Sequence, residues 1–254
     1  MKKIHVASIV LAFSLSACGG SSSSTSTSAT PNNPQSTATA EGFWSGTTNT
    51  GRSISGLVLD DGTTWFIYTS ATNNQLIAGA IEGNGVSNNG SFTSTNSVDF
   101  NLEGAGVRTA TVSASYTPKQ TLTGTVSYPS AGNLTFTSTY DASYETTPNL
   151  ALLVGNYSGV SAVKAGTEAG VASVDANGNF QSTGTSGCKS SGTISPHKKG
   201  NVYNLTLQYG PSPCATPGGT VTGVVFYQAT TSQLFGLAIN ATRDNGLIFL
   251  GKKI

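Results

Sequence analysis

Acidic side chains are scarce in this sequence, so each carboxyl group that could act in catalysis can be considered individually. Asp99 and Glu103 lie four residues apart in a stretch, 97–103, that reads as a β-strand. Alternate side chains of a strand share a face, and two carboxyl groups on one face could hydrolyse a glycosidic bond. Asn101 would share that face, so a solvated polar face is the simpler interpretation. We predict no catalytic residues.

Histidine and metal chemistry have little support in the sequence. The chain has two histidines, His5 and His197, and only His197 would remain after a predicted N-terminal signal is removed. His197 lies in a Pro-His-Lys-Lys-Gly segment that we interpret as an exposed loop tip. A lone histidine does not make a His-based zinc site, and no Gly-x-Ser-x-Gly motif supplies a serine nucleophile. Asp175, Asn177 and Asn179 are spaced like the start of a calcium loop but lack its glycine and its closing glutamate. We interpret them as a hairpin turn and predict no metal, no cofactor and no enzymatic activity.

The beginning of the chain has the layout of a secretory signal. Lys2 and Lys3 precede a mostly apolar stretch, 4–14, which is followed by small residues. The apolar stretch is shorter than the roughly 20 residues that a membrane-spanning helix needs. One interpretation is an ordinary signal peptide that is cut near Ala17.

The four residues Leu15-Ser16-Ala17-Cys18 resemble the lipobox of bacterial lipoproteins at every position. In that family the cysteine is lipidated on its sulfur and becomes the new N-terminus. Two or three acyl chains, at about 0.8 kcal/mol per buried methylene, make a lasting membrane anchor. Gly19 stands where an aspartate would favour the inner membrane. If the organism is a Gram-negative bacterium, the resemblance therefore implies an outer-membrane lipoprotein that faces the periplasm or the cell surface.

The other two cysteines, Cys188 and Cys214, form an even pair in a chain that carries an export signal. Export to an oxidising compartment favours a disulfide between them. Closing a loop of about 25 residues would stabilise the fold by about 3–4 kcal/mol in the chain-entropy model. Two buried thiols are the alternative, and a metal site would lack two further ligands.

The composition indicates an all-β protein with many turns. Charged residues make up only 9% of the 254 residues, and 31 residues are glycine, whereas typical soluble domains carry about 25% charge. Without Lys2 and Lys3, the twelve basic residues become ten, against eleven acidic ones. Such a near-neutral chain has no electrostatic footprint for nucleic acid.

The chain divides into an export signal, a tether and two β-domains. From residue 41 onward, short alternating runs separated by turn residues predict antiparallel strands, and the best helical candidate is a short one at 148–154, capped by Thr147. A Ser/Thr-rich, almost uncharged segment before them cannot offset the entropy of ordering and is expected to be disordered. The predicted parts are a signal peptide (1–17), a lipidated tether (18–40), a first β-domain (41–147) and a second β-domain (148–254), each β-domain an antiparallel barrel or sandwich.

Two homologous halves are indicated by three pairs of similar segments that occur in the same order. The alternative is that these similarities arise by chance in a sequence rich in Gly, Ser and Thr. Strands 65–68 and 224–227 are apolar on both faces, so they either lie between two packed layers or line a barrel whose outside packs on its neighbour. Both arrangements allow the two halves to dock on each other. The paired segments are 42–46 with 155–159, 57–62 with 172–178, and 122–128 with 221–227.

The lipobox, the polar tether and the tandem Gly-rich β-domains together resemble tandem β-barrel surface lipoproteins such as transferrin-binding protein B and factor H-binding protein. No binding residue is carried over from them. The resemblance implies a non-enzymatic binding or adhesion module at the cell envelope, anchored in the membrane through Cys18, with a protein or glycan partner. The alternatives are a lipocalin-like carrier of a small apolar ligand and an envelope-structural protein. A cavity inside a barrel would favour the carrier.

Overall fold

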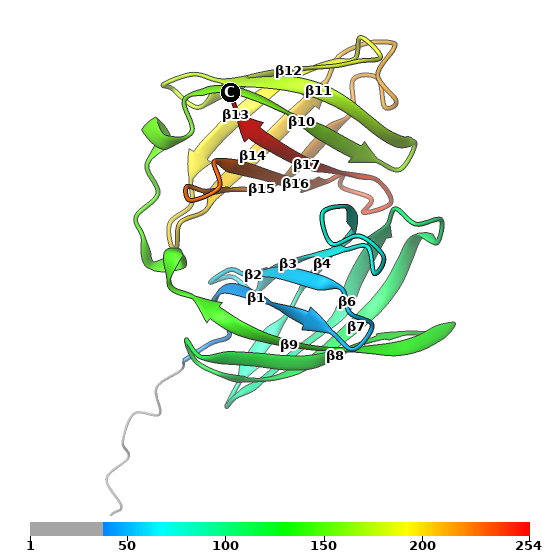
Figure 1. The fold of residues 1–254 in the computed structure, drawn as a ribbon, viewed down its shortest axis with the longest axis vertical. Coiled ribbons are helices and arrows are strands. Elements are labelled where there is room, and N and C mark those ends of the chain that lie inside the picture. Colours follow the sequence, from blue (N-terminus) through cyan, green and yellow to red (C-terminus); the bar gives the residue numbers. More distant parts are fainter. Residues whose placement is uncertain (1–37) are drawn as a thin grey trace, which may run out of the picture. The chain divides into compact units, whose positions relative to one another are not determined.

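Two closed antiparallel β-barrels follow one another along the chain (Figure 1). The computed structural model describes residues 38–254. The predicted signal peptide, the lipobox with Cys18 and nearly all of the tether therefore lie outside the described residues. The predicted all-β class is confirmed, and each domain is a barrel rather than a sandwich.

The first barrel is a ring of eight strands with a ninth strand attached. Pairing of β1 with β9 and of β4 with β6 closes the ring, while β5 pairs only with β6. Gly85 separates β4 from β5. The strands are β1 (Gly42–Thr48), β2 (Ser53–Val58), β3 (Thr63–Thr69), β4 (Ile77–Asn84), β5 (Val86–Asn88), β6 (Ser91–Asn101), β7 (Gly106–Thr117), β8 (Thr121–Tyr128) and β9 (Ala131–Asp141).

The second barrel has eight strands in sequence order and is closed by the pairing of β10 with β17. The strands are β10 (Gly155–Val163), β11 (Gly166–Val174), β12 (Asn179–Gly184), β13 (Lys189–Pro196), β14 (Tyr203–Tyr209), β15 (Thr220–Gln228), β16 (Gln233–Ile239) and β17 (Gly246–Lys253).

Two short 3-10 helices, η1 (Ala142–Glu145) and η2 (Leu150–Leu152), connect the barrels. The helix expected at 148–154 is thus a single turn, and its cap is Asn149 rather than Thr147. The Asn149 side chain accepts a hydrogen bond of 3.0 Å from the Ala151 amide, as capping side chains do. Within residues 38–254 no helix is long and apolar enough to cross a bilayer.

Both barrels begin with the same local structure, which accounts for the first pair of similar segments. Trp44 of β1 is 1% exposed and Tyr157 of β10 is 0% exposed. Each donates a hydrogen bond to the carbonyl four residues earlier, Trp44 Nε1 to Ala40 at 2.9 Å and the Tyr157 hydroxyl to Leu153 at 2.7 Å. In both barrels the aromatic ring therefore fastens the preceding segment onto the barrel core.

The second pair of similar segments forms the same turn in both barrels. Gly62 precedes β3 with a φ of +87°, and Gly178 precedes β12 with a φ of +80°. Their carbonyl oxygens accept hydrogen bonds from the amides of Gly85 (2.8 Å) and Ile194 (2.7 Å). The first turn is thereby bonded to the residue that follows β4, and the second turn is bonded to β13. In each barrel this is the second strand after the turn, so the two glycines occupy equivalent positions.

The third pair is not structurally equivalent, so that part of the repeat prediction is wrong. Segment 122–128 lies in β8, the seventh strand of its ring, whereas segment 221–227 lies in β15, the sixth strand of its ring. The likeness has a local cause. A Cβ atom added at Gly124 or Gly223 would lie only 2.5 or 2.0 Å from a backbone oxygen of the neighbouring strand, so both strands need glycine there.

Large side chains fill the interior of the first barrel. The inward rings of Phe66 and Phe136 lie 5.7 Å apart, and Trp44, Phe92, Tyr116 and Leu122 complete the same core. An eight-stranded barrel is only just wide enough for side chains to fill it. The first barrel is therefore built as a packed core.

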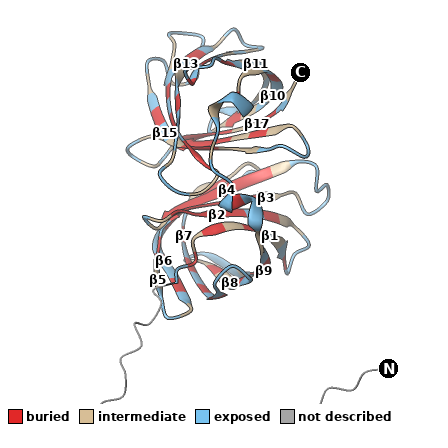
Figure 2. Cartoon of the chain, turned by 90° about the vertical axis from the view of Figure 1, so that its left-hand side faces the viewer, coloured by how far each residue is buried: buried red, intermediate tan, exposed pale blue. Residues whose placement is uncertain are grey.

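Outward-facing residues of the two barrels form a shared apolar cluster within the single compact unit 37–254. Trp65 and Ile67 of β3 and Val224 of β15 belong to it, and Figure 2 shows the buried residues along β3 and β4. Of the two arrangements that the sequence left open for the strands that are apolar on both faces, the structure shows a barrel whose outside packs on its neighbour. Arg243, in the loop before β17 of the second barrel, also forms an ion pair with Glu82 of β4 in the first barrel.

His197 is not an exposed loop tip, and that expectation is wrong. Its Nε2 lies 3.0 Å from Asp60 Oδ1, and its Nδ1 lies 2.7 Å from Asn204 Oδ1. Burial acts to raise the pKa of Asp60, but hydrogen bonds from His197 and Lys198 outweigh it and lower that pKa. The histidine is held because the Asp60 carboxylate needs partners when it leaves water.

Gly178→Ala is expected to destabilise the second barrel, because the new Cβ would lie 2.1 Å from the Ile194 carbonyl oxygen. Gly218→Ala is the matched control, since its φ of +71° is also positive but no atom lies within 4 Å of an added Cβ. We expect losses of about 2–4 kcal/mol and about 1–2 kcal/mol in the free energy of unfolding, respectively. Equal losses in a denaturant titration would contradict the close approach at this turn.

Candidate ligand-binding site

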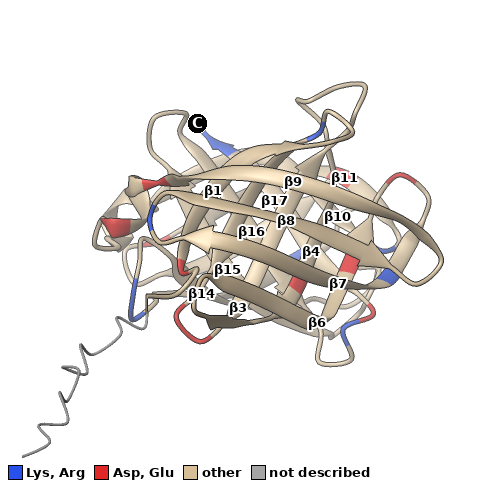
Figure 3. Ribbon diagram, turned by 90° about the horizontal axis from the view of Figure 1, so that it is seen from below, with Lys and Arg blue, Asp and Glu red and all other residues tan. Residues whose placement is uncertain are grey.

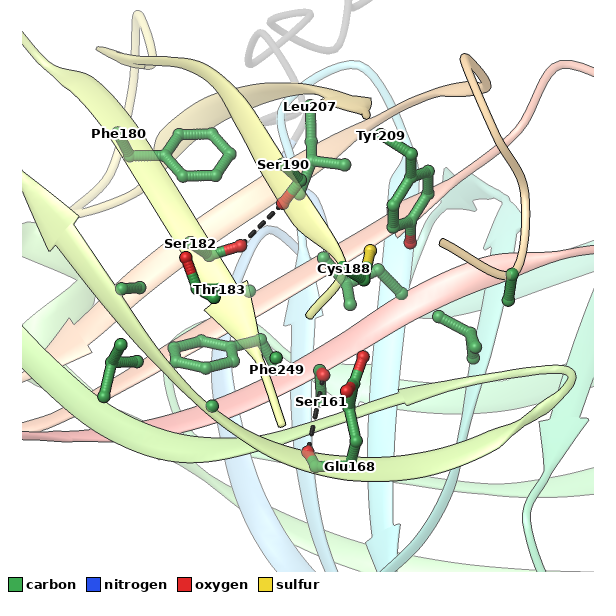
Figure 4. A pocket seen from close by; sticks show the side chains of 18 of the residues that line it. Ser161, Glu168, Phe180, Ser182, Thr183, Cys188, Ser190, Leu207, Tyr209 and Phe249 are labelled. Atoms are coloured by element: carbon green, nitrogen blue, oxygen red, sulfur yellow. Dashed lines mark hydrogen bonds between the residues drawn. The ribbon is translucent and has the colours of Figure 1, made fainter. Parts of the chain in front are cut away.

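The second barrel contains a cavity of about 270 Å³ that is open to the outside (Figure 4). It lies toward the end of the barrel formed by the loops 164–165, 185–188 and 210–219. Apolar side chains make most of its wall, among them Phe180, Ile194, Leu205, Leu207, Leu234 and Phe249. A small, largely apolar cavity with a few polar groups is the usual form of a small-molecule site.

Small residues stand where the first barrel has large ones. In the first barrel, Phe66 lies four residues after the turn glycine and pairs across the strands with Ile81. In the second barrel, the position four residues after the turn glycine is Ser182, which pairs with Ser190. The two serine hydroxyls lie 2.6 Å apart and line the cavity (Figure 4). A bulky apolar pair is thus replaced by a small polar pair.

A second cross-strand pair shows the same change. Ile54 pairs with Tyr68 in the first barrel, and at the equivalent register Gly170 pairs with Gly184 in the second. Both glycines line the cavity. Two cross-strand pairs of large side chains in the first barrel are thus pairs of small residues in the second, which leaves room for the cavity.

Tyr209 supplies an unpartnered polar atom at the cavity. It pairs with Ser190 across β13 and β14, in the place that Asp99 occupies beside Ile81. Its hydroxyl oxygen is buried and has no hydrogen-bond partner among residues 38–254, and burial raises the pKa of Tyr209 to about 12. A buried polar atom without a partner costs about 1–3 kcal/mol, so this hydroxyl is ready to bond a ligand.

Glu168 is the single charged residue in the cavity lining. Its Oε2 accepts a hydrogen bond of 3.0 Å from the Ser186 amide. The Ser161 hydroxyl donates to its backbone oxygen at 3.5 Å. In Figure 4 the Glu168 carboxyl group and the Tyr209 hydroxyl point toward the same part of the cavity, beside Cys188.

A disulfide between Cys188 and Cys214 closes the loop at this end of the barrel, as expected from the sequence. The two Cα atoms lie 4.5 Å apart. Pro213 and Ala215, on either side of Cys214, line the cavity. The disulfide therefore fixes part of the cavity wall to the start of β13.

Asp99 is buried inside the first barrel, so the expected solvated face is wrong. Its side chain is 0% exposed. Its carboxylate accepts hydrogen bonds from the Tyr68 hydroxyl (2.7 Å), the Tyr128 hydroxyl (3.0 Å) and the Arg108 guanidinium (2.6 Å). Burial and the charge of Asp99 raise the pKa of both tyrosines. The Asp99 carboxylate therefore has its hydrogen-bond partners within the barrel.

Glu103 does not join Asp99, because β6 ends at Asn101. The Asn101 side-chain oxygen accepts hydrogen bonds from the amides of Glu103 and Ala105, both at 3.0 Å, and so turns the chain away from the strand. Glu103 instead pairs with Arg52 at 2.7 Å, and the hydrogen bond from Arg52 lowers the pKa of Glu103. The carboxylate pair considered for glycoside hydrolysis is not assembled.

Asp175 forms the hairpin turn predicted in place of a calcium loop. Its Oδ1 accepts hydrogen bonds from the amides of Asn177 (2.8 Å) and Asn179 (2.9 Å). Across residues 38–254 no three His, Cys, Asp or Glu side chains are grouped so that they could hold a metal ion.

The residues that make the cavity were not singled out from the sequence. Their signal is a run of serine and glycine at inward positions, Ser182, Gly184 and Ser190, where the first half has aromatic and branched residues. That signal needs the cross-strand register, because Ser182 and Ser190 become neighbours only when β12 pairs with β13.

Comparisons with known proteins find likeness only among solved structures. No family model matches the chain, and no curated protein matches it. A mutant of the vaccine antigen transferrin-binding protein B from Haemophilus parasuis Hp5 is 8% identical, with a TM-score of 0.29 over 80% of this chain and 66% of that one. Intact Ap-TbpB, with its N and C lobes, is 9% identical, with a TM-score of 0.27 over 80% and 66%. Such likeness assigns neither ligand nor function.

Asp99→Asn is expected to destabilise the first barrel, because it leaves Arg108 facing a neutral group inside the barrel. We expect the free energy of unfolding to fall by about 2–4 kcal/mol. Glu145→Gln is the control, since it removes an exposed ion pair with Lys119, and such pairs contribute below about 1 kcal/mol. If denaturant titration gives the two variants the same stability, Asp99 is not a structural ion-pair partner.

Proposed function

We propose that this chain is a non-enzymatic binding module of the cell envelope whose second barrel takes up a small, mainly apolar ligand. The observation that carries the proposal is the cavity of about 270 Å³ inside that barrel. The first barrel has the same ring of eight strands but a filled interior. This contrast supports the carrier interpretation over the purely structural one.

The cavity volume limits the ligand to a small molecule. An apolar cavity of about 150 Å³ holds benzene in another protein. On that scale, about 270 Å³ holds roughly ten to twelve non-hydrogen atoms. A bicyclic aromatic compound or the end of a short alkyl chain fits this size.

The proposal keeps the sequence-based expectation that the chain is not an enzyme. Asp99 and Glu103, the two carboxylates considered for catalysis, each serve as the partner of an arginine and lie in separate surroundings. Binding of a protein or glycan partner at the cell surface stays a prediction from the sequence.

We also propose that Cys18 is lipidated and anchors the chain in the outer membrane of a Gram-negative bacterium. The support is the lipobox Leu15-Ser16-Ala17-Cys18 and the residue that follows it, Gly19.

Filling the cavity should weaken ligand binding without unfolding the barrel. The double variant Ser182→Phe with Ser190→Ile introduces the side chains of the first barrel at the equivalent places. We expect binding of naphthalene, followed by its fluorescence, to weaken at least about tenfold. Should the double variant fail to fold, the single variant Ser182→Leu fills part of the same cavity and should also weaken naphthalene binding.

The matched control is the neighbouring cross-strand pair, Gln181 with Ser191, which faces outward and is exposed. Gln181→Phe with Ser191→Ile adds the same side chains outside the barrel and should leave naphthalene binding unchanged. Binding that survives in the filled variant, or that is absent from the unaltered protein, would overturn the proposed function.

Cys18→Ala is expected to release the protein from the membrane, or to leave it held by an uncut signal, without unfolding the barrels. The reason is that the acyl chains attach to the Cys18 sulfur and supply the binding free energy. Metabolic acyl labelling followed by membrane fractionation checks this. An acyl label that persists in the variant would refute the anchor.

A further inference from the structure

We propose that the ligand of the second barrel carries a cationic head group, an amine or ammonium, which binds the Glu168 carboxylate while the apolar body lies inside the cavity. The inference rests on the proposed function and names the chemical class of the ligand. Its first support is that Glu168 is the single charged residue lining the cavity.

Most buried or partly buried acidic residues of the described chain have a basic partner: Glu41 has Lys199, Asp60 has Lys198, Glu82 has Arg243, and Asp99 has Arg108. Glu168 and Asp141 do not, and Asp141 caps η1 by accepting a hydrogen bond from the Ser143 amide. Glu168 is also partly buried, but no Lys, Arg or His of residues 38–254 lies within 4.0 Å of it, and the Ser186 amide is the hydrogen-bond donor to its carboxylate. A carboxylate removed from water without a counter-charge is costly, so a ligand cation would recover free energy there.

Glycine at position 184 gives the carboxylate its place inside the barrel. A Cβ atom added at Gly184 would lie 2.3 Å from Glu168 Cδ, so the Glu168 side chain lies directly over this residue. The carboxylate therefore lies over Gly184, at the cross-strand pair of Gly170 with Gly184. A ligand in the cavity would therefore meet the negative charge of Glu168 in the cavity lining.

In the first barrel, whose interior is filled, the position equivalent to Glu168 is occupied by a paired arginine. Val58 and Val174 are equivalent, because each pairs with the glycine that begins the first strand of its barrel. Arg52 and Glu168 each lie six residues before that valine, so they also occupy equivalent positions. Arg52 lies over the Tyr68 ring, 5.6 Å from its centroid, and is neutralised by Glu103. The second barrel has neither the ring nor the counter-charge.

The Tyr209 hydroxyl supplies a second contact for such a head group. Its oxygen is buried without a partner and points toward the same part of the cavity as the carboxylate (Figure 4). An ammonium group has three N–H donors, and the Tyr209 oxygen is a free acceptor in the lining of the same cavity. A carboxylate-ended ligand such as a fatty acid would meet the like charge of Glu168 and is disfavoured.

Three probes with one naphthalene skeleton test the head group: 1-naphthylmethylamine, 1-naphthalenemethanol and 1-naphthoic acid. Their binding is measured at pH 7 by fluorescence on the full-length, unlipidated Cys18→Ala chain. We expect the amine to bind at least about tenfold more tightly than the acid, with the alcohol between them. Glu168→Gln should remove most of this difference, and Glu168→Arg should reverse the order. Glu145→Gln, which removes one negative charge outside the cavity lining, should leave the order unchanged.

The outcomes separate the head-group inference from the proposed function. Equal binding of the three probes to the unaltered protein, or an order unchanged in Glu168→Gln, overturns the cationic head group and leaves the ligand-holding cavity standing. Absence of binding by all three probes overturns the proposed function itself. Binding of the amine that persists in the Ser182→Phe, Ser190→Ile variant places the amine outside the cavity and also overturns the inference.

Discussion

The width of an eight-stranded ring is the constraint on which this structure depends. The number of strands fixes how much space a small barrel encloses, so the size of the inward side chains decides whether that space is filled or open. Both rings here have eight strands. In the first, cross-strand pairs such as Phe66 with Ile81 fill the space; in the second, Ser182 with Ser190 and Gly170 with Gly184 leave it open.

Charges follow the same division. Charged residues are few, and Figure 3 shows them mainly at strand ends and loops. At the end of the first barrel that corresponds to the cavity mouth, Arg52, Asp99, Glu103 and Arg108 neutralise one another in two ion pairs. In the second barrel Glu168 remains without a basic partner among residues 38–254. In the filled barrel these four charges are paired, whereas the cavity of the second barrel is lined by a carboxylate without a basic partner and by the unpartnered Tyr209 hydroxyl.

The sequence predicts much of the fold because its signals are local. Turn glycines such as Gly62 and Gly178 and the aromatic residues Trp44 and Tyr157 indicate two β-domains that begin alike, and the paired cysteines predict the disulfide. The cavity and the burial of Asp99 are different. They depend on which residues become neighbours across strands, and a single sequence does not show that register. The error over Glu103 is local too, since Asn101 ends the strand before it.

Xenon is the most direct probe of the central claim, that the second barrel is hollow where the first is filled. Xenon enters apolar cavities of this size without needing a specific polar contact. In a crystal held under xenon pressure, we expect an anomalous peak inside the second barrel, among Phe180, Leu207 and Phe249, and none inside the first. A second barrel without xenon, or equal peaks in both barrels, would contradict the account.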